Sequence, residues 1–118
     1  MLPLIPAILL GVSAVALASL TPFWEDIVTF AKKVLAKLQP LFQEEIEGFL
    51  VYLRKEAQGL VKKVQKNYMK NEAGKYTERI VTENILLDDV EAKFRARLRR
   101  QDEIDISEEL QLELTKVS

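Results

Sequence analysis

The 118-residue chain contains no cysteine and no histidine. Without cysteine it forms neither a disulfide framework nor a thiolate metal site, and it offers no cysteine nucleophile. Without histidine it lacks the commonest general base and metal ligand. It also has no glycine-rich phosphate loop and no nucleophile elbow. These absences argue against an enzyme, and we expect no catalytic residue, no cofactor and no metal ion.

The chain also lacks an excess of charge of either sign. Seventeen basic and eighteen acidic side chains leave a net charge of -1. Such a balance favours neither nucleic acid nor an acidic surface as a partner. We therefore do not expect nucleic acid among the partners, and the local distribution of charge carries more information than the sum.

Charged side chains are absent from the first 24 residues, and residues 2–20 are nearly all aliphatic or small. A bilayer core about 30 Å thick needs about 20 helical residues, so this segment is long enough to cross. A signal peptide would begin with basic residues, where this chain has Pro3 and Pro6. We predict a transmembrane helix over residues 1–21, with a cleaved signal peptide or a buried helix as alternatives.

Small residues lie along one side of this predicted helix. Such rows let helix backbones approach closely in lipid, so we expect a packing contact between membrane helices. Its members are Ala7, Gly11, Ala14 and Ala18. Three lysines between residues 32 and 37 follow the membrane segment, and the positive-inside rule then places the N-terminus outside and the C-terminus in the cytoplasm.

A second helix is predicted to start at Thr21-Pro22, with threonine as the N-cap and proline at the first helical position. Its apolar face is wide, and Phe23 and Trp24 at its start are suited to anchoring it in the membrane interface. A wide face buried in a helix bundle is the alternative. Pro40 is expected to kink this helix. Residues 22–40 are therefore interpreted as an amphipathic membrane-proximal helix.

Apolar residues recur in steps of three, four and four from Trp24 to Tyr68. An eleven-residue repeat of this kind is typical of a coiled coil whose seam runs nearly straight along the helix. We predict that residues 41–73 continue the helix as a stalk along which copies of the chain associate. The predicted seam residues are Leu35, Leu38, Phe42, Ile46, Phe49, Leu53, Leu60 and Val64.

Basic residues cluster on one flank of the predicted stalk and again near residue 100. Such clusters can contact phosphate or carboxylate groups, although a solvated charged face is the alternative. The candidate anion contacts are Lys62, Lys66, Lys70, Arg97 and Arg100.

Residues 74–118 are predicted to form a small cytoplasmic C-terminal region that could bind another protein. Residues 76–83 are rich in β-branched types, which suggests a short strand. Asp88 and Glu91 have the spacing of a capping box, which predicts a helix from about residue 88 to 101. Residues 107–118 match both a helix and a strand, and we favour the helix.

The sequence thus predicts a mainly α fold: an N-terminal transmembrane helix, a long amphipathic helix kinked near Pro40, and a small C-terminal α or α+β segment. Membrane lipid and further copies of the chain are the expected partners. The predicted function is that of a small single-pass membrane protein that assembles into a pore-like ring or scaffold. The alternative is a membrane-anchored adaptor that recruits a protein, nucleotide or nucleic acid.

Overall fold

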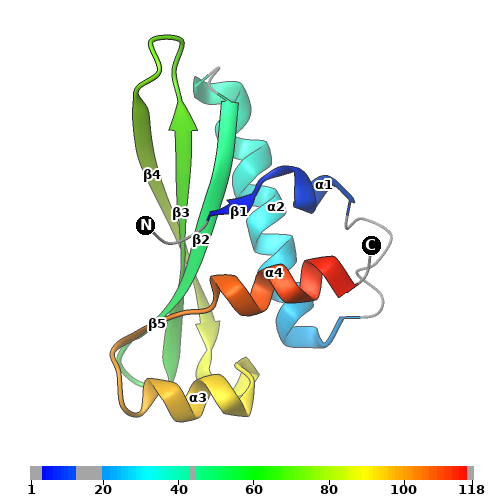
Figure 1. The fold of residues 1–118 in the computed structure, drawn as a ribbon. Helices are drawn as coiled ribbons and strands as arrows, with labels where there is room; N and C mark the ends of the chain where they lie inside the picture. The colour runs from blue at the N-terminus through cyan, green and yellow to red at the C-terminus, as the bar shows by residue number, and fades with distance from the viewer. Residues whose placement is uncertain (1–3, 13–19, 43–44, 117–118) are drawn as a thin grey trace.

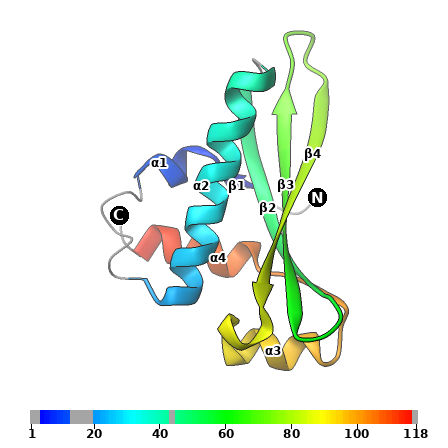
Figure 2. The same cartoon turned by 180° about the vertical axis from the view of Figure 1, so that it is seen from behind.

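The computed structural model describes residues 4–12, 20–42 and 45–116. In chain order the elements are β1 (Ile5–Pro6), α1 (Ile8–Val12), α2 (Pro22–Phe42), β2 (Glu45–Lys55), β3 (Leu60–Lys70), β4 (Tyr76–Leu86), the 3-10 helix η3 (Leu87–Asp89), α3 (Ala92–Leu98), β5 (Glu103–Asp105) and α4 (Ser107–Lys116). In these residues α1, α2 and α4 lie on one side of an antiparallel sheet, and α3 lies at one end of its long strands (Figures 1 and 2).

The sheet is built on two consecutive hairpins. Strands β2, β3 and β4 are eleven residues long each and pair in chain order. The short strands β1 and β5 both pair with β2, β1 at Gly48 and Phe49 and β5 at residues 52–54. Because β3 occupies one edge of β2, these two strands lie along its other edge. No described strand pairs with the far edge of β4.

Helix α2 covers one face of the sheet, which we call the inner face; the opposite side is the outer face. Its buried side chains meet the inner-face residues of β2 and β3 in one apolar core. Full burial of one such side chain stabilises the fold by about 1.5–3 kcal/mol. On α2 the buried residues are Phe23, Trp24, Ile27, Val28, Phe30, Ala31, Val34, Leu35 and Leu38.

Two tight turns produce the hairpins. Gln58 and Gly59 have φ angles of 59° and 76°, and Gly74 has a φ angle of 81°. Glycine adopts these positive angles without steric cost. In the second turn the backbone N–H of Asn71 donates to the carbonyl of Lys75 at 3.0 Å. Gly59 and Gly74 therefore reverse the chain direction where the sequence pattern predicted a helix and its end.

The predicted mainly α fold and its coiled-coil stalk are wrong. The helix ends at Phe42, and residues 45–70 form the β2–β3 hairpin. The predicted seam is divided among elements: Leu35, Leu38 and Phe42 are on α2, Ile46, Phe49 and Leu53 on β2, and Leu60 and Val64 on β3. The seam residues of β2 pack in the core, whereas those of β3 lie on the opposite face of the sheet, so the seam is not one continuous surface.

The predicted transmembrane helix is also wrong. Residues 5–6 form a strand that pairs with β2, and α1 has only five residues. Across residues 4–12, 20–42 and 45–116, no helix combines the length and the hydropathy needed to cross a bilayer. The single-pass placement, the outside N-terminus and the membrane pore, scaffold or adaptor function all depended on that helix and are withdrawn with it. Of the small-residue row, Ala7 directly precedes α1 and Gly11 is within it; Ala14 and Ala18 lie outside the described residues.

Several boundaries agree with the sequence prediction. α2 begins at Pro22, and the backbone N–H of Trp24 donates to Oγ1 of Thr21 at 3.4 Å, as an N-cap requires. Residues 107–116 are helical as α4, and the strand suggested at residues 76–83 is part of β4. The capping box predicted at Asp88 and Glu91 is wrong, because α3 covers only Ala92–Leu98 and its N-cap Glu91 makes no side-chain cap bond. The helix start at Thr21-Pro22 was therefore informative, whereas that capping box and the long-range repeat were not.

Candidate interaction surface

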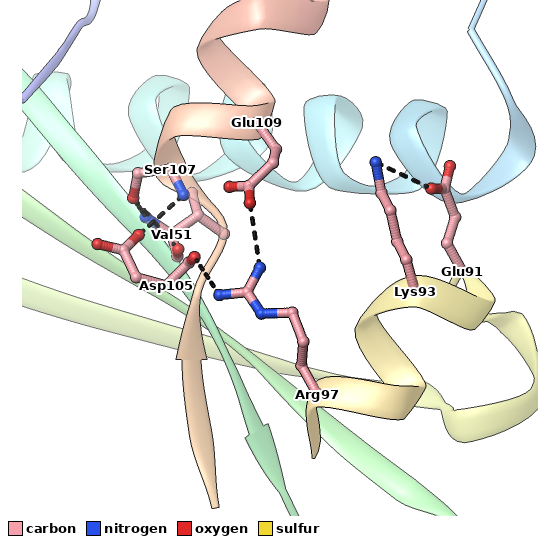
Figure 3. A network of polar contacts seen from close by, with 7 residues as sticks. All are labelled: Val51, Glu91, Lys93, Arg97, Asp105, Ser107 and Glu109. Carbon is pink, nitrogen blue, oxygen red and sulfur yellow. Dashed lines mark hydrogen bonds and ion pairs between the residues drawn. The ribbon is translucent and has the colours of Figure 1, made fainter. Parts of the chain in front are cut away.

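The edge of β2 that faces away from β3 is covered by β1, β5 and Ser107. Between the segments paired to β1 and β5 lies Val51, whose backbone N–H donates to Oγ of Ser107 at 2.8 Å. The same hydroxyl donates to the carbonyl oxygen of Val51 at 3.2 Å (Figure 3). The backbone N–H of Ile106 donates to that oxygen as well, at 3.0 Å. Ser107 is buried. The Ser107 side chain thus hydrogen-bonds both the N–H and the C=O of Val51, the edge residue that neither β1 nor β5 pairs with.

Polar contacts from α3 and β5 hold Ser107 in place. Its backbone N–H donates to Oδ1 of Asp105 at 2.8 Å. Arg97 of α3 donates to Oε1 of Glu109 at 3.0 Å and to the carbonyl oxygen of Asp105 at 3.5 Å (Figure 3). Arg97, predicted as an anion contact, therefore binds a carboxylate of its own chain and ties α3 to α4.

Within residues 4–12, 20–42 and 45–116 no strand pairs with the far edge of β4, which we call the open edge. Three contacts show which backbone groups of β4 and its flanks point toward β3: the carbonyl of Lys75 accepts from Asn71 N at 3.0 Å, the carbonyl of Arg79 accepts from Asn67 Nδ2 at 3.1 Å, and the N–H of Leu87 donates to Gly59 O at 2.8 Å. All three residues are odd-numbered, and the β3–β4 register is unbroken. Since the direction alternates along an antiparallel strand, the even-numbered residues of β4 direct their N–H and C=O groups away from the sheet.

Most side chains of β4 are also exposed. Of the five exposed large hydrophobic residues in the described part of the chain, three are on this strand: Tyr76, Ile80 and Leu86, at 59%, 53% and 57% exposure. All three have even numbers, so they share the outer face. A long strand with an open edge and exposed apolar side chains is a template for pairing with another chain.

An ion cluster fixes the middle of β4 against α2. Lys63 of β3 is only 1% exposed, and its ammonium contacts Asp26 of α2 and Glu83 of β4, the latter at 2.7 Å. It also lies 4.9 Å from the centre of the Phe30 ring. The hydrogen bond from Lys63 lowers the pKa of Glu83 below its usual value. These contacts tie β4 to β3 and α2.

The structure gathers some predicted anion contacts and separates others. Lys62, Lys66 and Lys70 lie on the outer face of β3, where Lys66 Nζ is 4.6 Å from the Tyr52 ring centre and Lys70 Nζ is 5.7 Å from that of Tyr76. Lys62 pairs with Glu56 at 3.3 Å. By contrast, Arg97 is on α3 and Arg100 directly follows it. The arginines therefore do not extend the lysine row.

The two predicted membrane anchors lie in the core. Phe23 and Trp24 are 4% and 2% exposed, and their rings pack against Phe94 of α3 with centroids 5.5 and 5.7 Å away. Their aromatic area joins α2 to α3. The wide apolar face of α2 is buried, but against a sheet and not in the helix bundle of the alternative prediction.

Comparison with protein families, curated proteins and solved structures found no match. The candidate surface is therefore defined by geometry. Sequence reasoning missed it because a β-branched run indicates a strand but does not say whether that strand ends at a sheet edge.

Proposed function

We propose that this chain is a protein-interaction module that receives a β-strand of another polypeptide at the open edge of β4. The observation that carries the proposal is the contrast between the two edges of the sheet. The edge of β2 is occupied by β1, β5 and Ser107, whereas the edge of β4 has no partner among the described residues.

The geometry suits strand addition, in which main-chain hydrogen bonds supply affinity and alternate side chains supply specificity. β4 offers eleven residues, about twice the usual strand length of 5–6. The outer face of β4 also carries the exposed side chains of Tyr76, Ile80 and Leu86. A strand paired with β4 would bury part of their apolar surface. The middle of β4 is held by Lys63, so little order has to be gained when a strand docks.

Nuclear magnetic resonance of the isotope-labelled chain tests this function, with a peptide of the β4 sequence (residues 76–86) as the strand probe. The chain is kept at the lowest usable concentration, so that binding of the peptide is observed separately from self-association. We expect the amide signals of Glu78, Ile80, Thr82 and Asn84 to shift and their hydrogen exchange to slow, because these amides face outward.

The matched variants are T82P and T82A. Proline removes an outward N–H that makes no bond to β3, and such edge positions tolerate it; alanine keeps the N–H. We expect T82P to weaken peptide binding and T82A to preserve it. Equal binding to both variants, or no binding to the wild-type chain, would contradict the proposed function.

A second candidate function is binding of a polyanion by the outer face, supported by the alignment of Lys62, Lys66 and Lys70 beside Tyr52 and Tyr76. Inorganic polyphosphate is a suitable probe, and its affinity for the chain should fall with salt. We expect the K66A/K70A double variant to lose binding and K93A, which changes a lysine on α3, to retain it. Equal losses in the two variants would exclude this use of the face.

A further inference from the structure

The sequence of β4 complements itself when the strand is paired with an antiparallel copy. If two copies are centred on Val81, Arg79 of each lies opposite Glu83 of the other. Tyr76 lies opposite Leu86, so the exposed apolar residues near the two ends of the strand meet. Ile80 meets Thr82, Glu78 meets Asn84 and Thr77 meets Ile85. The whole strand overlaps without an unpaired end.

The backbone permits this register. Even-numbered residues of β4 direct their N–H and C=O groups outward, as the contacts at Lys75, Arg79 and Leu87 establish. In the register centred on Val81, even residues lie opposite even residues and can exchange hydrogen bonds. The two Val81 residues then form a non-hydrogen-bonded pair on the axis. Residues of the inner face also meet only residues of the inner face.

Neighbouring registers lose the complementarity. Centring the pair on Ile80 places Arg79 opposite Val81 and Glu83 opposite Thr77. Centring it on Thr82 places Arg79 opposite Ile85 and Glu83 opposite Val81. Both shifts remove the two symmetric ion pairs and leave residues at the strand ends unpaired. Exposed charge pairs of this kind mainly select register and partner.

We propose that the strand received by β4 is the β4 of a second copy of this chain, paired antiparallel about a two-fold axis at Val81. The inference rests on the proposed function and names its partner. The combined sheet then runs from β1 and β5 of one copy to β1 and β5 of the other, and because these short strands and Ser107 occupy the β2 edge of each copy, the assembly stops at two. Each Glu83 lies between Lys63 of its own chain and Arg79 of the second copy.

Sedimentation equilibrium tests the copy number. At high concentration we expect twice the chain mass of 13.5 kDa for the wild type and T82A, and the single mass for T82P. A wild-type chain that keeps the single mass at every concentration overturns the dimer, while the peptide experiment decides separately whether the β4 edge accepts a strand. A T82P variant that remains dimeric shows association through another surface and overturns the dimer, while the peptide experiment still decides the proposed function.

Disulfide cross-linking tests the register, and the absence of cysteine makes each introduced thiol unique. Cα atoms of a non-hydrogen-bonded antiparallel pair are about 4.5 Å apart, within the range of about 4.4–6.8 Å that disulfides span. V81C should therefore give a covalent dimer on mild oxidation. In T77C the thiols are separated by eight residues of strand, about 27 Å at about 3.4 Å per residue.

We therefore expect a cross-linked dimer from V81C and monomer from T77C at the same chain concentration. A dimeric chain in which T77C cross-links as well as V81C has a different register, and that result overturns the inference. As a check that does not depend on cysteine, R79E places a glutamate opposite Glu83 and should weaken dimerisation more than R79A does. Equal effects of R79E and R79A would also count against the register.

Discussion

Replacing Ser107 with alanine tests the closure of the β2 edge. The hydroxyl accepts the N–H of Val51 at 2.8 Å and donates to the carbonyl of Val51 at 3.2 Å. In S107A the carbonyl keeps its bond from the N–H of Ile106, at 3.0 Å, but the N–H of Val51 loses this acceptor. Val51 is fully buried, so water cannot replace the hydroxyl without opening the contact between α4 and β2.

The expected cost follows from that one N–H group. A buried donor left without a partner costs about 1–3 kcal/mol, and the carbonyl adds little because one of its bonds remains. We expect S107A to lower the free energy of unfolding by about 2 kcal/mol. For a chain of this length 1 kcal/mol corresponds to about 4 °C in Tm, so Tm should fall by about 8 °C.

Urea unfolding followed by circular dichroism measures this loss. Protein concentration must be the same for all variants, because a chain that self-associates has a concentration-dependent midpoint. The matched control is T115A on the same helix, which removes an exposed hydroxyl bonded to the carbonyl of Leu112 at 3.1 Å. That control should change stability by less than about 0.5 kcal/mol. A loss in S107A no larger than that of T115A would refute the reasoning.

Three further predictions concern other contacts. G48A should cost about 1–3 kcal/mol in the same urea assay, because a Cβ there would lie 2.8 Å from the carbonyl oxygen of Ile5 and would displace β1; an unchanged midpoint would contradict this. Lys63 lowers the pKa of Glu83 below 4.5, so the wild type should exceed E83Q in stability above pH 4.5 and lose that advantage as the pH falls through the folded-state value; a pH-independent difference would exclude the ion pair. K63M should change stability by less than about 1 kcal/mol, because the side chains of Asp26 and Glu83 are 42% and 44% exposed and can hydrate; a loss above about 3 kcal/mol would show that their charges stay buried.

The sequence indicated α2 correctly because its signals are local and agree with one another. Thr21 and Pro22 mark the start, and the wide apolar face from Phe23 onward is the face that packs on the sheet. What the sequence did not reveal is that this face is buried against a sheet. The apolar first segment suggested a helix in lipid. In the structure its residues 5–6 instead form β1, in which Pro6 pairs with Gly48 of β2.

The sequence of β3 does not look like that of a strand, because polar residues occupy several of its core-facing positions. Its inner face carries Lys63, Gln65 and Asn67, all nearly or fully buried. Gln65 donates to Oδ1 of Asn67 at 2.8 Å, and Asn67 donates to the carbonyl of Arg79. A strand with polar residues toward the core has no readable alternation of apolar and polar positions. The carboxylates that pair with Lys63 and the carbonyl of Arg79 lie on other elements, which a single sequence does not connect.

Strand β2 was predicted as helix because it has too many apolar residues, not too few. Residues 49–53 are apolar without interruption, so a three-four-four spacing can be traced through them as easily as a spacing of two. The feature that distinguishes the two interpretations is the turn at Gln58 and Gly59, where both φ angles are positive. Gly59 follows Gly48 by eleven residues, so both glycines fit the spacing of the repeat. In the structure Gly48 lies against β1 and Gly59 forms a turn.

The contrast between the two sheet edges explains why an open strand need not lead to polymers. A sheet with both edges free can add copies without limit, because each addition presents a new edge. Here Ser107, β1 and β5 occupy the β2 edge, so pairing at β4 leaves no second edge of the same kind. The buried Ser107 hydroxyl would then have a role beyond stability, since it limits how many copies one sheet can join.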